Sequence, residues 1–298
     1  MGLSSSVCPE WKAEQWPQAF ATSPWMGPRT TVSFRALWAA IFSAHVIWNW
    51  WVRGRGDGAY HFIFLTVQAS WLEAFNLTVQ WVVAMMGFPY LQTMQISPPE
   101  PCLARFSIAL NSMSQPLSTV VAVLFWVLIY PDSGGDICYM DYFLHGINSG
   151  LLLLNLLVTR IPFSCARVGW LVLYQILYVG WTYAHYRLRI GIRGGCWNCP
   201  EDWTSLDDCD AEYPADECPI YATIDWHHPL AAAQLGFGLA SVLIAVVQGV
   251  YVGLVTCRDA NDKKLDLWMA ESREMPEFMP LEYFTREDAP NCACWKCA

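Results

Sequence analysis

The stretch DYFLHGINSGLLLLNLL, residues Asp141–Leu157, places a histidine, two asparagines and a serine in a run that is otherwise apolar enough to cross a bilayer. Apolar runs recur along the 298-residue chain, in which 55% of the residues are hydrophobic, 14% are charged and 17 are tryptophan. A typical soluble domain carries about 25% charged residues. Lipid is therefore the expected solvent for most of this chain.

The length of the apolar runs indicates helices that span a membrane. A helix of about 20 residues crosses the hydrocarbon core, and lipid does not tolerate unpaired backbone groups. We therefore expect an all-α polytopic membrane protein, a six-helix transmembrane bundle. The expected spans are residues 34–52, 61–87, 104–130, 138–159, 166–188 and 229–256.

The distribution of lysine and arginine predicts the orientation. Of the 17 cations, 12 lie on the side of the two termini and 5 on the opposite side. By the positive-inside rule, both termini are cytosolic, in the plasma membrane or an endomembrane. The expected parts are a cytosolic tail over 1–31, a membrane domain over 32–258 that includes an outer loop over 190–228, and a cytosolic tail over 259–298.

The N-terminus matches a lipidation pattern. Met1–Ser6 fits the myristoylation motif, with Gly2 as the acceptor and Cys8 as a candidate palmitoylation site. Both modifications occur in the cytosol, which agrees with the predicted orientation. The pattern is short, so an unmodified N-terminus fits it equally well.

The outer loop between the fifth and sixth spans holds four cysteines: Cys196, Cys199, Cys209 and Cys218. Two disulfides are the leading interpretation for an extracytosolic loop, and their pairing is open among three possibilities. A zinc site is the alternative, because Cys196 and Cys199 have metal-ligand spacing. The later two cysteines do not form a second such pair, so we expect no metal and no other cofactor.

The second span carries a polar stripe made of Thr66, Ser70, Glu73, Asn76 and Gln80. Their spacings of three, four and seven put them on one helix face, which we expect to point into the bundle. Hydrogen bonds between helices explain most of these residues. Glu73 is harder to explain in this way, because a carboxylate deep in a bundle must be protonated or paired.

Helix rise places Thr66 and His145 at one depth, together with His45, roughly 10 Å below the outer surface. A neutral imidazole can take the proton of a hydroxyl that attacks an ester, so Thr66 and His145 form a candidate catalytic pair. Asn148, one turn after His145, is a candidate to orient the imidazole or the substrate. His45 is either part of this site or an anchor at the end of its helix.

Three motifs in order resemble the rolling-stone-like membrane proteins, which are relatives of the androgen-induced membrane proteins. The motifs are Phe62–Thr66, His145–Ser149 and Ile220–Pro229, and the resemblance covers residues 35–257. For the androgen-induced branch, it implies an intramembrane hydrolase of fatty acid esters of hydroxy fatty acids. The threonine of its motif falls on Thr66 and the histidine on His145.

The motif around His145 departs from the hydrolase branch. That branch is more similar to His-Gly-Met-His-Thr, whereas this chain has Ile147, Asn148 and Ser149 after His145-Gly146. The rolling-stone branch, which has such residues, implies a link to muscle-cell fusion. The alternative function is therefore a non-catalytic membrane protein that acts in cell contact or fusion, or as a subunit of a larger assembly.

Asp225, just before Pro229, is interpreted as a helix cap or as a residue that orients or gates the site.

The charge of the chain narrows the expected partners. A net charge of −9 without a basic cluster argues against nucleic-acid binding. We expect membrane lipids as partners, and proteins that bind the outer loop or the C-terminal tail.

Overall fold

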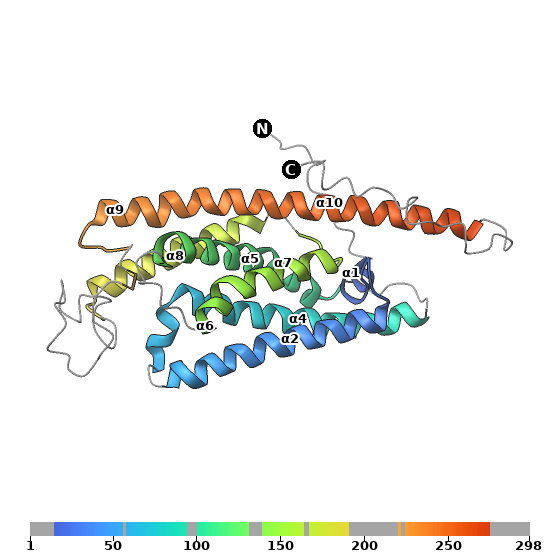
Figure 1. Cartoon of the computed structure of the whole chain (residues 1–298), viewed down its shortest axis with the longest axis horizontal. Coiled ribbons are helices and arrows are strands. Elements are labelled where there is room, and N and C mark those ends of the chain that lie inside the picture. The colour runs from blue at the N-terminus through green and yellow to red at the C-terminus, as the bar shows by residue number, and fades with distance from the viewer. Residues whose placement is uncertain are drawn as a thin grey trace.

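The computed structural model describes residues 15–55, 58–93, 100–130, 139–163, 167–190, 220–221 and 224–274. These residues are almost entirely helical and contain no β-strand, which confirms the all-α prediction. The long helices lie roughly side by side along the longest axis of the molecule (Figure 1). Gly2, Cys8 and the four cysteines of the predicted outer loop lie outside the described residues.

The first half of the chain contains these elements: α1 (Trp16–Ala21), α2 (Pro28–Asn49), the π-helix η2 (Trp50–Gly54), the 3-10 helix η3 (Gly58–Ile63), α4 (Leu65–Thr93), α5 (Cys102–Leu124) and the π-helix η4 (Phe125–Ile129). The second half contains these: α6 (Tyr139–Tyr142), the π-helix η6 (Phe143–Ile147), α7 (Asn148–Val158), α8 (Val168–Arg187), α9 (Pro229–Ala233), the π-helix η9 (Gln234–Leu239) and α10 (Ala240–Glu274). Each π-helix directly continues the α-helix before it.

Three helices in the described part of the chain are long and apolar enough to cross a membrane: Pro28–Val52, Cys102–Ile129 and Pro229–Ala260. The last of these exposes Val242, Val246 and Val250 at helical spacing, which suits contact with lipid tails. α4 and α8 also fall on expected spans, but they are not among these three helices. The membrane character of the chain is thus supported, and the number of six spans stays a prediction.

The structure differs from several of the expected boundaries: α2 begins at Pro28 instead of residue 34, and α4 ends at Thr93 instead of residue 87. α4 begins at Leu65 instead of residue 61, because Gly58–Ile63 form a 3-10 helix before it. α10 continues to Glu274, so the first part of the expected C-terminal tail extends the last span as helix.

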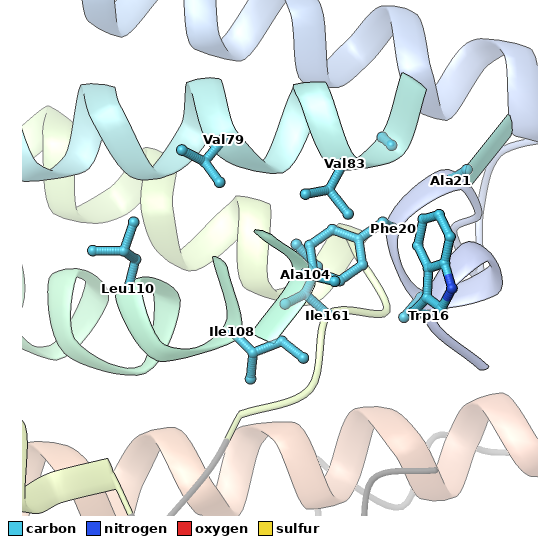
Figure 2. Close-up of a cluster of buried hydrophobic side chains, with 11 residues drawn as sticks. Trp16, Phe20, Ala21, Val79, Val83, Ala104, Ile108, Leu110 and Ile161 are labelled. Carbon is cyan, nitrogen blue, oxygen red and sulfur yellow. The ribbon is translucent and has the colours of Figure 1, made fainter. Parts of the chain in front are cut away.

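The expected N-terminal tail also contains a packed element. α1 inserts Trp16 and Phe20, both almost fully buried, against Val79 and Val83 of α4 and Ile108 of α5 (Figure 2). Gly87 on α4 allows this approach, since a Cβ there would lie 3.0 Å from the backbone of Pro17. α1 therefore closes one end of the helix assembly, the end at which α2 and α5 begin.

A buried arginine fixes α1 to the helices beside it. Arg35 of α2 donates from Nε to the Phe20 carbonyl at 2.6 Å and from Nη1 to Gln80 Oε1 at 3.0 Å. Gln80 Nε2 in turn donates to Asn111 Oδ1 of α5 at 2.9 Å. α1, α2, α4 and α5 are thus joined by one chain of hydrogen bonds.

Arg258 of α10 has a similar role at the C-terminal end of α7. Its Nη1 donates to the carbonyls of Leu156, Thr159 and Ile161 at 3.0, 2.7 and 3.2 Å. The last carbonyls of a helix have no partner within the helix and carry partial negative charge. Arg258 satisfies them and attaches α10 to α7.

Candidate functional site

A pocket lies between the first turn of α4, the second half of α5 with η4, η6, α8, and η9 with the start of α10. It contains about 820 Å³ of empty space, part of which is open to the surroundings. Most of its wall is leucine, isoleucine and valine, and the polar side chains that line it are those of Thr66, His145, Tyr174, Gln175, Tyr178 and Tyr221. Thr66 and His145, chosen from the sequence, therefore line the same pocket.

Thr66 is held by the way the first turn of α4 is capped. The Leu65 amide donates to two phenol oxygens at 3.0 Å, those of Tyr178 and Tyr221. Tyr178 donates onward to the Ile63 carbonyl at 2.9 Å. The Tyr221 hydroxyl is also within hydrogen-bonding reach of Thr66. These contacts fix the α4 N-terminus, whose first amides lack partners within the helix.

Burial raises the pKa of the Tyr221 phenol above its ordinary value, which keeps the hydroxyl protonated at neutral pH. A protonated phenol can donate a hydrogen bond to an oxygen that binds beside Thr66. Tyr221 is thus placed to act on the same group as Thr66.

His145 lies in the π-helix η6. Its ring stacks on Phe125 with 3.6 Å between ring centroids and 2° between planes, so the plane of the imidazole is fixed. A π-turn replaces i→i+4 bonds by i→i+5 bonds and recurs at functional sites. Trp126 Nε1 donates to the His145 carbonyl at 2.7 Å, so the backbone of this turn is held from the neighbouring helix.

The opposite wall is formed around a second π-helix, η9. Gln175 of α8 donates from Nε2 to the Gly236 carbonyl at 2.7 Å and accepts from the Ser241 hydroxyl at 3.2 Å. Gly236 lets the two helices approach closely here, since a Cβ there would lie 3.2 Å from the Val179 side chain. Two of the three π-helices at the pocket are therefore tied by side chains from another helix.

Asn148 and His45, which the sequence grouped with His145, do not line this pocket. Asn148 Nδ2 donates to Glu73 Oε2 at 2.5 Å and to Ser118 Oγ at 3.3 Å, so its amide is directed between α4 and α5. His45 stacks on Phe143 at 3.5 Å between centroids. Neither geometry resembles a group that orients the His145 imidazole.

Asp225 also lies outside the pocket wall, although its neighbour Ile224 is part of it. Its Oδ1 accepts from the His227 amide at 2.9 Å and lies 2.7 Å from His227 Nδ1. The residue that caps α9 is His228, three positions later. Asp225 thus shapes the turn before α9 and does not cap the helix itself.

Sequence reasoning missed the tyrosines and the glutamine of the pocket. Tyr174, Gln175 and Tyr178 follow Leu171 at spacings of three and four, the signature of one helix face. That signal was present in the sequence. Tyr221 follows a long segment of the chain outside the described residues, and no periodicity points to it.

The arrangement suits a ligand with an acyl chain. The apolar wall would accept the chain, and the hydroxyl, imidazole and phenol groups that line the pocket could contact an ester. Among the residues that the structure describes, no cluster of His, Cys, Asp or Glu has the form of a metal site. No family model, curated protein or solved structure matches this chain.

Proposed function

We propose that this protein is a six-span integral membrane protein, with both termini cytosolic, that hydrolyses lipid esters in the pocket between α4, α5, α8 and α10. One observation carries the proposal: Thr66 and His145, 79 positions apart in the sequence, both line one apolar pocket. The resemblance to rolling-stone-like and androgen-induced proteins supports the same two residues. Fatty acid esters of hydroxy fatty acids are the substrate class that this resemblance suggests.

In the proposed reaction, Thr66 is the nucleophile and His145 is the general base. Thr66 Oγ attacks the ester carbonyl while His145 takes the hydroxyl proton. The tetrahedral intermediate collapses, and the departing alcohol receives that proton from His145. Water, activated by the same imidazole, then releases the fatty acid and restores Thr66. Tyr221 is placed to donate a hydrogen bond to the carbonyl oxygen during both steps.

Labelling of the purified full-length protein by a fluorophosphonate probe tests the proposal. We expect labelling of the wild type, together with release of fatty acid from an ester of a hydroxy fatty acid. Thr66→Ala and His145→Gln should abolish both. Labelling or hydrolysis that persists in both variants would rule out the proposed pair.

Matched controls separate chemistry from folding. Thr78 also lies on α4 and donates to a carbonyl of its own helix, at Ala74, but does not line the pocket. His185 is a buried histidine on α8, likewise outside the pocket wall. Thr78→Ala and His185→Gln should retain labelling, provided that a thermal unfolding transition shows each variant to be folded.

A non-catalytic function in cell contact, or as a subunit of an assembly, is the second candidate. The observation in its favour is the environment of Asn148, whose amide bonds Glu73 and Ser118 instead of the His145 imidazole. The outer loop and the C-terminal tail would then be the surfaces for protein partners. This function would be favoured if a stoichiometric partner co-purified with the protein and the fluorophosphonate probe did not label it.

A further inference from the structure

Glu73 lies at the centre of a second polar site, separate from the pocket. Its side chain, on α4, is completely buried. Asn148 of α7 donates to Glu73 Oε2, and the Ser118 hydroxyl of α5 also reaches the carboxylate. Three helices therefore converge on one acidic group. Within the described part of the chain, no arginine, lysine or histidine forms an ion pair with it.

Two oxygens of this site have no hydrogen-bond partner among the described residues: Glu73 Oε1 and Asn148 Oδ1. Each belongs to the same carboxylate or amide group as an atom of the 2.5 Å hydrogen bond between the two side chains. The two oxygens therefore belong to one pair of hydrogen-bonded side chains. Both residues are more than nine-tenths buried.

The surroundings add further polar groups that lack partners. Gln115, one turn before Ser118 on α5, is fully buried, and neither atom of its amide has a hydrogen-bond partner among the described residues. The same holds for Asn76 Oδ1, one turn after Glu73 on α4. A buried polar group without a partner destabilises the folded state, because it has lost its hydrogen bonds to water. Several such groups beside one carboxylate leave polar atoms available to a bound ligand.

The chemistry of the site selects the ligand. Carboxylate, amide and hydroxyl oxygens suit hard cations, whereas zinc and other transition metals favour histidine and cysteine. One carboxylate balances one positive charge, and a divalent ion would leave an uncompensated charge away from water. We propose that Glu73, Asn148 and Ser118 bind a sodium ion between α4, α5 and α7.

Protonation of Glu73 is the competing way to neutralise the carboxylate, and it predicts no response to sodium. The two cases can be separated by thermal unfolding of the full-length protein in detergent, followed by tryptophan fluorescence. Sodium chloride is compared with choline chloride at equal ionic strength and constant pH. A ligand at tenfold its Kd should raise Tm by about 3 °C.

The variants locate the effect. Glu73→Gln removes the charge at nearly constant size, and the sodium-dependent shift of Tm should disappear. Ser118→Ala should reduce it. Glu100→Gln is the matched control, because Glu100 pairs with Arg105 at 2.7 Å and lies outside this site, so the shift should remain.

Two outcomes would overturn the proposal: an equal Tm of the wild type in sodium and choline, or a sodium shift that persists in Glu73→Gln. If Glu73→Gln does not fold, Asn148→Ala provides the test, since it removes the amide oxygen and should weaken the sodium response. None of these measurements depends on hydrolysis. The sodium site and the lipid pocket can therefore fail independently.

Discussion

The two halves of the molecule use buried polar residues in opposite ways. At the end closed by α1, Arg35 bonds Phe20 and Gln80, and Gln80 bonds Asn111. At the other end, Thr66 and His145 face an apolar pocket. At the end closed by α1, these polar groups hold helices together. At the other end, polar groups line space that a ligand can fill. Substitutions should therefore lower stability at one end and activity at the other.

The largest expected effect is that of Arg35→Leu. The change leaves the Phe20 carbonyl and Gln80 Oε1 buried without a donor, and we expect a loss of about 3 kcal/mol in the free energy of unfolding. Thermal unfolding in detergent measures it. Arg29→Leu, at the exposed start of α2, is the control and should leave Tm unchanged. Equal effects of the two variants would contradict the role given to Arg35.

Arg258→Leu should have the next largest effect, about 2 kcal/mol, because it removes the donor shared by three carbonyls at the end of α7. Arg258→Lys retains the charge without the planar fork, so its Tm should lie between those of the wild type and the leucine variant. A lysine variant no better than leucine would show that charge at this helix end is unimportant.

Gly87→Ala tests the packing of α1. Its new Cβ would press on the backbone of Pro17 and on the Trp16 ring, and overpacking of this kind costs roughly 1–2 kcal/mol. Gly150→Ala on α7 is the matched change, since nothing lies within 4 Å of its Cβ. Chemical or thermal unfolding should show that only Gly87→Ala is destabilised. A stable Gly87→Ala protein would mean that α1 shifts easily.

The smallest effect on stability is expected for Ala240→Phe, which should act on labelling instead. The added ring would occupy the pocket from α10, with a stability change below about 1 kcal/mol and about tenfold weaker labelling by the fluorophosphonate probe. Ala245→Phe lies on the exposed side of the same helix and should label normally. Normal labelling of Ala240→Phe would place the reactive group elsewhere.

The sequence predicted the all-α fold and the inward face of α4, where Ser70, Glu73, Asn76 and Gln80 are all buried. Those predictions rest on local periodicity, which one helix determines by itself. α1 escaped prediction because six residues are too few to show a period, and its burial depends on α4 and α5. The partner of Asn148 was also missed, because spacing shows which residues share a face but not what lies opposite.

The π-helix η6 explains why His145 lines the pocket whereas Asn148 bonds Glu73. In an uninterrupted α-helix, two residues three positions apart would lie on nearby faces. The geometry of the two sites therefore depends on the number of residues in this turn. A π-turn holds one residue more than an α-turn, so deletion of Gly146 would restore α-helical winding. The helix before the deletion would rotate by about 100° relative to α7. His145 would leave the pocket while Asn148 remained beside Glu73. The loss of a single residue would therefore remove the imidazole from the pocket without disturbing the hydrogen bonds around the carboxylate.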